Sequence, residues 1–211
     1  MKNSFNATVA DPTWGTLAAW SWAASRALDY LVTDSDLDSN KVAVIGHSRG
    51  GKSALWAAAQ DTRLALACVN AAGHGGSKLI RMDPASMASI NKNYPHWFTP
   101  AYKKYIGKED SQPFDQHELV ALVAPRGYHG GDAVDDVKAY PRASYLGLFE
   151  ASKAWGLFGK TKTWKADSVE PGKFLTDGAL AYHLREGKHD LSPKDWANYL
   201  DHADRYFGST R

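Results

Sequence analysis

The chain has 211 residues, a formal net charge of +2, and 44% apolar against 23% charged residues. This composition predicts a globular protein with one sizeable core and excludes a disordered chain; without a basic stripe, a nucleic-acid partner is not expected. No apolar run reaches the roughly 20 residues of a membrane span, and no apolar signal-peptide segment follows Met1–Asn6. The single Cys68 excludes an internal disulfide.

The first half of the chain alternates between helical and strand patterns. Helical spacing predicts a helix from Asp11 to about Leu31, and Val42–Ile45 is an apolar run typical of a buried strand. A helix over Lys52–Gln60 and a strand over Leu64–Val69 follow. The first helix should bury Trp14, Leu17, Ser21, Ala24, Leu28 and Leu31. Strand, helix and strand in this order predict a parallel sheet with a crossover helix, an α/β fold within a single domain, 1–211.

The second half is less regular. Residues 77–116 predict a packed excursion over the sheet, and Glu118–Ala124 fits either a helix end or a strand. Gly127–Gly131 is poor strand material because of its glycines. We predict a helix over Tyr145–Phe158 and a last strand over Gly178–Leu184. A final helix should follow the capping-box sequence that begins at Ser192, with Trp196, Leu200, Ala203 and Phe207 as its buried stripe.

The turn between the first predicted strand and the next helix carries the chemistry. Gly46-His47-Ser48-Arg49-Gly50 fits G-x-S-x-G, the nucleophile elbow, in which a tight strand-to-helix turn holds a serine hydroxyl above the sheet. The flanking glycines remove Cβ atoms that would clash there. The pattern therefore predicts Ser48 as a nucleophile; the alternative is a glycine-rich turn with an idle serine.

A serine nucleophile needs a base, usually a histidine oriented by a carboxylate. His189 fits best, because it lies in the loop between the last predicted strand and the last helix. The acid should lie in the preceding loop, which offers Asp132, Asp135 and Asp136. The alternatives are a solvent-exposed loop histidine and aspartates that only cap a helix.

Two cations stand beside the predicted nucleophile. Arg49 is adjacent to Ser48 and could stabilise an oxyanion, and Lys52 lies one helical turn further on. Cations at a helix amino end are electrostatically unfavourable, which favours a functional interpretation over ordinary surface charge. No cluster of cysteine and histidine has zinc spacing, so we predict neither a metal nor a cofactor.

Several segments resemble the bacterial glucuronoyl esterases of carbohydrate esterase family 15, over nearly the whole chain. The matching segments are Trp14-Gly15-Thr16, Gly46-His47-Ser48-Arg49-Gly50-Gly51-Lys52 with Ala54-Leu55-Trp56, Gly73-His74-Gly75-Gly76, Ile90-Asn91, Pro95-His96-Trp97-Phe98, Pro113-Phe114-Asp115-Gln116-His117, Ala124-Pro125-Arg126, and His189 with Asp195-Trp196. The resemblance implies an α/β-hydrolase, a mostly parallel sheet flanked by helices, that cleaves esters between 4-O-methyl-glucuronic acid on xylan and lignin alcohols.

The resemblance also implies roles for single residues. Ser48 matches the nucleophile, His189 the base and Arg49 the oxyanion arginine, while Asp136 matches the acid of many bacterial members. Lys52 matches a lysine that contacts sugar hydroxyls, and we expect Trp97 and His74, from the matching segments, in substrate binding. The fungal acid position holds Ala71, which excludes that acid. A sugar-facing tryptophan and a uronate-binding glutamate of the family are replaced by Lys138 and Ala85.

The resemblance further implies several strands before the elbow strand, whereas only 41 residues precede Val42. We therefore expect the elbow strand to have a bare edge, and the chain to be a fragment or to associate through that edge. The family likeness implies a secreted or periplasmic enzyme whose partner is glucuronoxylan or a small ester. Two alternatives stay open: a promiscuous or acetyl esterase, and a catalytically silent carbohydrate-binding remnant.

Overall fold

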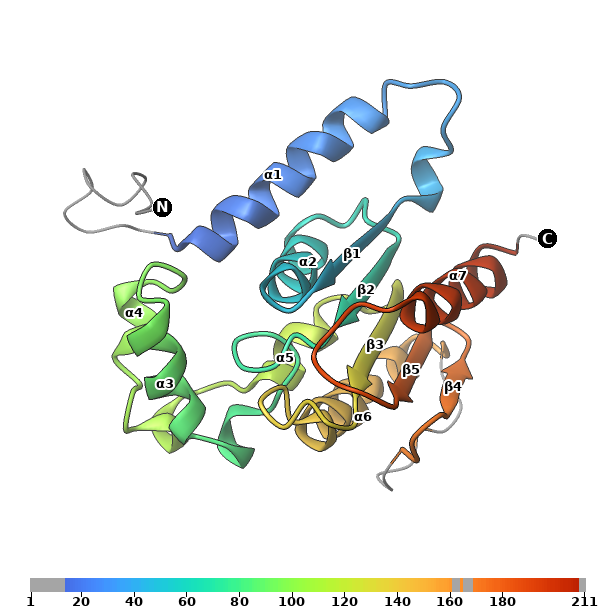
Figure 1. The fold of residues 1–211 in the computed structure, drawn as a ribbon. Helices are drawn as coiled ribbons and strands as arrows, with labels where there is room; N and C mark the ends of the chain where they lie inside the picture. Colours follow the sequence, from blue (N-terminus) through green and yellow to red (C-terminus); the bar gives the residue numbers. More distant parts are fainter. Residues whose placement is uncertain (1–13, 161–163, 165–168, 209–211) are drawn as a thin grey trace.

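The computed structural model describes residues 14–160, 164 and 169–208. Within these residues a five-stranded sheet has the order β1-β2-β3-β5-β4; β1, β2, β3 and β5 are parallel and β4 is antiparallel to β5 (Figure 1). The strands are β1 Ala43–His47, β2 Leu66–Asn70, β3 Gly127–Ala133, β4 Phe174–Asp177 and β5 Leu180–Arg185. The helices are α1 Thr16–Leu31, α2 Arg49–Gln60, α3 Ala85–Asn93, α4 Pro100–Lys103, α5 Gln116–Ala121, α6 Pro141–Leu157 and α7 Pro193–Phe207, with short 3-10 turns at Ser39–Lys41, Ile80–Met82 and Glu109–Ser111. The predicted α/β architecture is confirmed.

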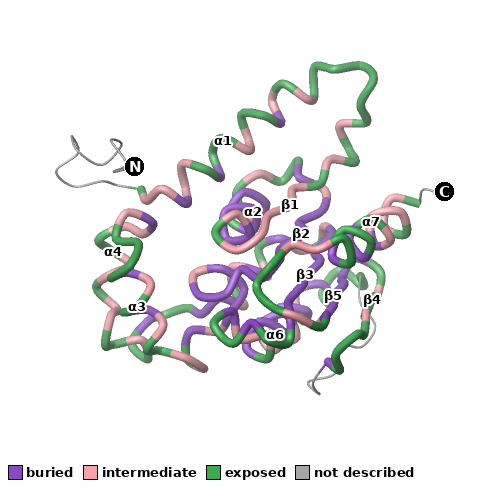
Figure 2. Tube along the Cα trace, viewed as in Figure 1, coloured by how far each residue is buried: buried purple, intermediate pink, exposed green. Residues whose placement is uncertain are grey.

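Helices cover both faces of the sheet. On one face α2 and α6 pack on the strands, with α5 against both of these helices and α1 against α2. Together they enclose the larger core cluster around Leu55, Tyr128 and Trp155. On the other face α7 covers β2, β3 and β5 and encloses a smaller cluster that includes Cys68. Figure 2 shows the burial concentrated in β2, β3 and β5 and in α2. Burial raises the pKa of Cys68 to about 12, so its thiol stays protonated and inert.

The predicted helices are found, with shifted boundaries. The first ends at Leu31 as expected, while its predicted start at Asp11 lies outside the described residues. Leu17, Ser21 and Leu28 are buried, but Trp14 is exposed. Segment 77–116 lies to one side of the sheet rather than over it (Figure 1). It is tied to α1 there, since Thr16 at the start of that helix donates from its amide and hydroxyl to the carbonyl of His96.

The predicted bare edge of the elbow strand is found in the described part of the chain. β1 is the terminal strand of the sheet and pairs only with β2 there. Ala43 is exposed and the rest of β1 is half-buried, whereas every residue of β2 is buried. No helix among the described residues is long and apolar enough to cross a membrane.

The buried stripe predicted for the last helix was wrong at two of its four positions, since Ala203 and Phe207 are half-buried against the smaller core cluster. Trp196 and Leu200 are exposed, and the inward residues are Asp195, Asn198, Tyr199 and His202. The sheet face beneath α7 presents buried polar side chains, among them Asn70, His129 and His183. Buried polar groups need hydrogen-bond partners, so α7 turns its polar and aromatic side toward the sheet.

The prediction against a strand at Gly127–Gly131 was also wrong, since β3 is the central strand and all its residues are buried. Its glycines leave room for large neighbours. A Cβ on Gly131 would lie 2.4 Å from the Tyr199 hydroxyl and 2.4 Å from His183 Cε1, and a Cβ on Gly130 would lie 2.9 Å from the ring of Tyr182. The tertiary packing therefore outweighs the low strand propensity of glycine.

We predict that Gly131→Ala lowers the free energy of unfolding by about 1–3 kcal/mol, because the added methyl group overpacks a closed site. The matched control is Gly156→Ala in α6, where a Cβ meets nothing within 4 Å. That substitution should stabilise the protein by up to about 1 kcal/mol, because alanine lowers the conformational entropy of the unfolded chain relative to glycine. Urea unfolding measures both, and a Gly131→Ala midpoint at or above that of the wild type would contradict this packing.

Candidate active site

Ser48 occupies a strained turn between β1 and α2. Its φ is 59° and its ψ is −120°, a conformation that residues with side chains rarely adopt. A Cβ on Gly46 would lie 2.1 Å from the carbonyl oxygen of Gly50, so the turn closes only with glycine there. The backbone N–H of Ser48 donates to the carbonyl of Asn70 at 2.9 Å, which ties the turn to the end of β2. This is the geometry of a nucleophile elbow.

His189 lies between Ser48 and Asp136. Its Nε2 is 2.8 Å from Ser48 Oγ, and its Nδ1 is 2.5 Å from Asp136 Oδ2. A carboxylate only accepts, so Nδ1 carries the proton and Nε2 is free to accept from the serine hydroxyl. Asp136 is buried, and its other oxygen accepts the amide of Ala139 at 3.1 Å, which fixes the carboxylate. The three side chains have the arrangement of a Ser-His-Asp triad.

The other two candidate acids lie elsewhere. Asp132 is buried in β3 and accepts the hydroxyl of Tyr182 at 2.9 Å. Burial raises its pKa well above the ordinary value, which favours the neutral acid. Asp135 is exposed. Of the three aspartates, Asp136 is therefore the one that the structure brings to His189.

Arg49 is exposed beside Ser48, with its guanidinium carbon 5.6 Å from the centre of the Trp97 ring. Trp97 is buried and stacks on Tyr94 at 4.0 Å. The backbone of this segment is close to α1, since a Cβ on Gly15 would lie 2.1 Å from the carbonyl oxygen of Trp97. Trp97 thus supports the cation beside the nucleophile through a cation–π contact.

Lys52 is almost completely buried, and its Nζ donates to the carbonyl of Ala72. Burial first, then the charges of Lys78 and Arg49 against an opposing effect of Asp136, lower its pKa to about 7. Near neutral pH the amine therefore exchanges between its charged and neutral forms, within one helical turn of Ser48.

His74 is buried, and both of its ring nitrogens have protein partners. Ser86 donates to the carbonyl of Asp83 at 2.7 Å, so its oxygen accepts from His74 Nδ1 at 2.6 Å, and His74 Nε2 accepts the hydroxyl of Tyr102 at 3.0 Å. Burial first, then the charges of Lys78 and Lys52, lower the pKa of His74 to about 3. The structure thus places His74 as a neutral, fully bonded side chain.

Comparison with known proteins gives the family. A family model described as "Glucuronyl esterase, fungi" matches residues 5–159. The chain belongs to this glucuronyl esterase family. It is 43% identical over 198 residues to "Carbohydrate esterase MZ0003" from an unknown prokaryotic organism, covering 92% of this chain and 45% of that one. It is 32% identical over 155 residues to the 4-O-methyl-glucuronoyl methylesterase of Hypocrea jecorina, covering 69% of this chain and 34% of that one.

Solved structures agree with the family. A glucuronoyl esterase from Solibacter usitatus superposes with a TM-score of 0.90 at 40% identity, covering 95% of this chain and 52% of that chain. A structure described as a promiscuous CE15 esterase from the marine bacterial metagenome gives 0.86 at 42% identity, covering 92% and 49%. The chain spans about half the length of these solved relatives and less than half of the curated ones.

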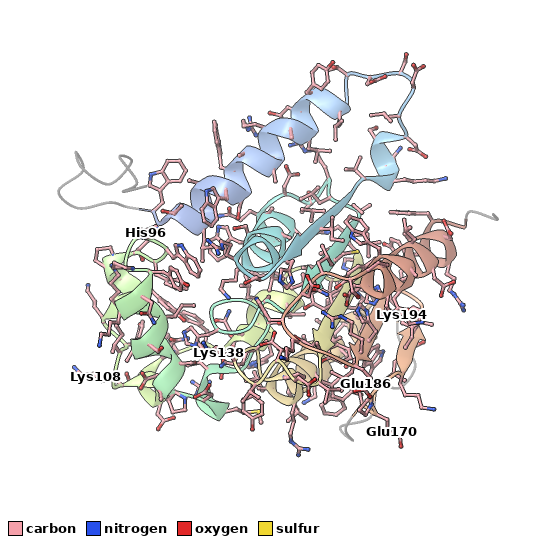
Figure 3. All side chains as sticks on the ribbon, viewed as in Figure 1. His96, Lys108, Lys138, Glu170, Glu186 and Lys194 are labelled. Carbon is pink, nitrogen blue, oxygen red and sulfur yellow. The ribbon has the colours of Figure 1, made fainter. Side chains whose placement is uncertain are left out.

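The two positions at which this chain departs from the family pattern are both open to solvent. Ala85 begins α3 and is exposed. Lys138 is exposed as well (Figure 3), and its carbonyl accepts Lys78 Nζ at 3.2 Å. Neither side chain can supply the aromatic face or the carboxylate that the resemblance implied.

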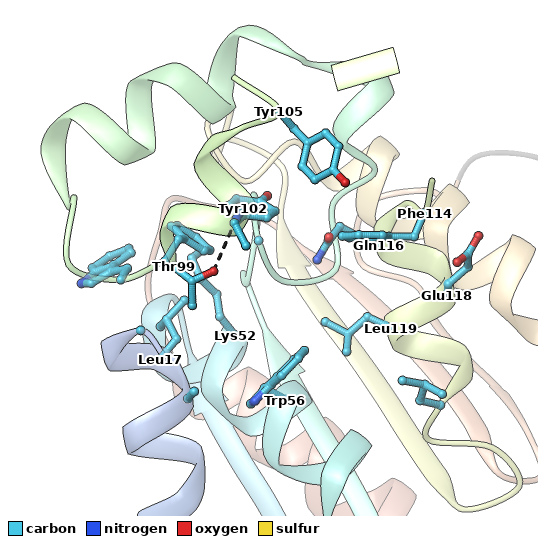
Figure 4. Close-up of a pocket in the computed structure, with 17 residues that line it drawn as sticks. Leu17, Lys52, Trp56, Thr99, Tyr102, Tyr105, Phe114, Gln116, Glu118 and Leu119 are labelled. Carbon is cyan, nitrogen blue, oxygen red and sulfur yellow. Dashed lines mark hydrogen bonds between the residues drawn. The ribbon is translucent and has the colours of Figure 1, made fainter. Parts of the chain in front are cut away.

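A pocket of about 610 Å³ has Lys52 in its lining, and no pattern in the sequence predicted it. Its walls come from the ends of α1 and α2, the 97–105 segment and α5, and are mostly apolar (Figure 4). Aromatic rings of Trp56, Tyr102 and Tyr105 line it, and Lys52 reaches into it from α2. Ser48 and His189 are not among the lining residues, but Lys52 and Trp97, two of the predicted substrate-binding residues, are.

The low pKa of Lys52 predicts a pH-dependent stability. An unfolded lysine stays protonated up to about pH 10.5, whereas buried Lys52 loses its proton near pH 7. Between these values the unfolded chain binds more protons, so the contribution of Lys52 to the free energy of unfolding rises with pH.

Lys52→Met should therefore stabilise the protein relative to wild type at about pH 6, and this advantage should shrink by about pH 10. The matched control is Lys92→Met, which changes an exposed lysine on α3. Its effect should be the same at both pH values. Chemical unfolding across the pH range measures this, and a constant difference for Lys52→Met would contradict the lowered pKa.

Proposed function

We propose that this chain is a serine carboxylic ester hydrolase that cleaves 4-O-methyl-glucuronoyl esters, including those between glucuronoxylan and lignin alcohols. The contact of His189 with both Ser48 and Asp136 is the observation that carries the enzyme class. The names of the family and of its relatives support the substrate class. The same ester chemistry suits small glucuronate esters as substrates.

In the proposed reaction, Ser48 Oγ attacks the ester carbonyl carbon while His189 Nε2 takes the hydroxyl proton. Asp136 holds Nδ1 protonated and stabilises the imidazolium that forms. The guanidinium of Arg49 stabilises the charge that develops on the carbonyl oxygen. His189 then donates its proton to the leaving alcohol, and a water molecule, activated by the same imidazole, releases the acid from Ser48.

A second candidate is a less selective esterase of the same mechanism. The exposed Lys138 and Ala85, at the positions where the family resemblance implies sugar contacts, favour it. A third candidate is a catalytically silent carbohydrate-binding protein. Binding of glucuronoxylan without turnover of any ester would support that third function.

Hydrolysis of benzyl glucuronate and of p-nitrophenyl acetate separates the first two candidates. We expect kcat/KM to be higher for the glucuronate, and Ser48→Ala to lower kcat on both esters by about 10⁶-fold, the scale of a lost serine nucleophile. The control is Ser152→Ala in α6, whose hydroxyl donates to the carbonyl of Phe149 in the same helix. Preference for the acetate would support the less selective esterase, and activity that survives Ser48→Ala would refute both.

A further inference from the structure

A series of polar side chains, linked by hydrogen bonds, leads from Asp195 in α7 to His47, whose ring contacts the ring of His189. Asp195 of α7 is fully buried, and its Oδ2 accepts from Arg185 Nε at 2.7 Å and from the amide and hydroxyl of Ser192, each at 2.7 Å. Its Oδ1 accepts from His183 Nε2 at 2.8 Å and from Asn70 Nδ2 at 3.1 Å. Asp195 is thus a fixed, multiply bonded anchor.

The anchor fixes the orientation of Asn70 at the end of β2. Asn70 Nδ2 donates to Asp195 and also to the hydroxyl of Tyr199 at 3.0 Å, so Asn70 Oδ1 is the remaining acceptor. His47 Nδ1 lies 2.7 Å from this oxygen. The amide therefore selects the form of His47 that is protonated on Nδ1, and holds its ring at the end of β1.

The ring of His47 packs against the ring of His189, with centroids 4.5 Å apart and planes tilted by 45°. Both nitrogens of His189 are engaged, by Ser48 and by Asp136, but two hydrogen bonds along one axis leave the ring free to tilt about it. His189 is exposed, so little else restrains it. His47 supplies a contact on a ring face, outside that axis.

We propose that His47, Asn70 and Asp195 form a positioning relay that holds the imidazole of His189 in line with Ser48 Oγ. The relay rests on the proposed function. Asn70 contributes twice, because its backbone carbonyl also accepts the amide of Ser48 at 2.9 Å. The same residue thus fixes the nucleophile through its backbone and the base through its side chain and His47, so both reacting groups share one rigid support.

The reaction of Ser48 with phenylmethylsulfonyl fluoride tests the relay without any ester substrate. The serine oxygen displaces fluoride from sulfur, His189 takes the proton, and the modified peptide is measured by mass spectrometry. His47→Ala should slow labelling of Ser48 about 10- to 100-fold, the scale for misaligned reacting groups. It should also lower thermal stability, because Oδ1 of buried Asn70 loses this partner, so labelling is compared at a temperature where both proteins are folded. On an ester, kcat should fall by the same factor while KM holds.

Two further variants complete the test. His47→Gln keeps a donor for Asn70 and should recover part of the labelling rate. His202→Gln changes a buried histidine of α7 that has no hydrogen bond to the relay and lies 3.4 Å from the carbonyl of Gly178. This control should lower thermal stability and leave the labelling rate within about twofold of wild type, as expected for an uncoupled site.

The outcomes separate the two proposals. Failure of wild-type Ser48 to react would overturn the proposed function and the relay together. Reaction of wild-type Ser48, with folded His47→Ala labelled at the wild-type rate, would overturn the relay alone. Loss of labelling in His202→Gln equal to that in His47→Ala would show that any buried substitution has this effect, which also overturns the relay.

Discussion

The hydrogen bond between His189 Nε2 and Ser48 Oγ joins residues 141 positions apart in sequence, and the proposed chemistry depends on it. The parallel strands make this contact possible, because the carboxyl ends of β1, β2, β3 and β5 all lie at the same end of the sheet. Ser48 follows β1, Asp136 follows β3, and His189 follows β5. The strained backbone of Ser48 then raises its hydroxyl toward the imidazole, at a conformational cost that the surrounding packing offsets.

Local chemistry explains which features the sequence could predict. The turn needs glycine at position 46 for a reason that lies within five residues, because a Cβ there would meet the carbonyl of Gly50. The expected need for glycine at position 50 was wrong, since a Cβ there would meet nothing within 4 Å. His189 follows from the chain order of hydrolase triads. The choice among three aspartates could not come from the residues alone, because it depends on which side chain faces His189. The family resemblance selected Asp136, and the structure brings that same carboxylate into contact with the imidazole.

The features that the sequence concealed depend on contacts between distant segments. The glycines of β3 lower its strand propensity, yet they make room for His183, Tyr199 and Tyr182. The stripe expected on α7 was apolar, but the sheet beneath it holds a polar network that needs Asp195. The error on α7 and the need for glycine at position 131 share one cause, the buried polar layer between α7 and the sheet, since no periodicity in the sequence marks a core held by hydrogen bonds. Gly130 instead makes room for Tyr182 of the larger core cluster.

The measurement that tests the account most directly is the activity of Asp136→Asn on the better of the two esters. An amide in place of the carboxylate favours the wrong tautomer of His189, so Nε2 cannot accept the serine proton. The account predicts that kcat falls by about 10⁴-fold, with KM and thermal stability close to wild type. A folded Asp136→Asn protein that keeps its kcat within about tenfold of wild type would contradict the account, because Asp136 would then not orient the base.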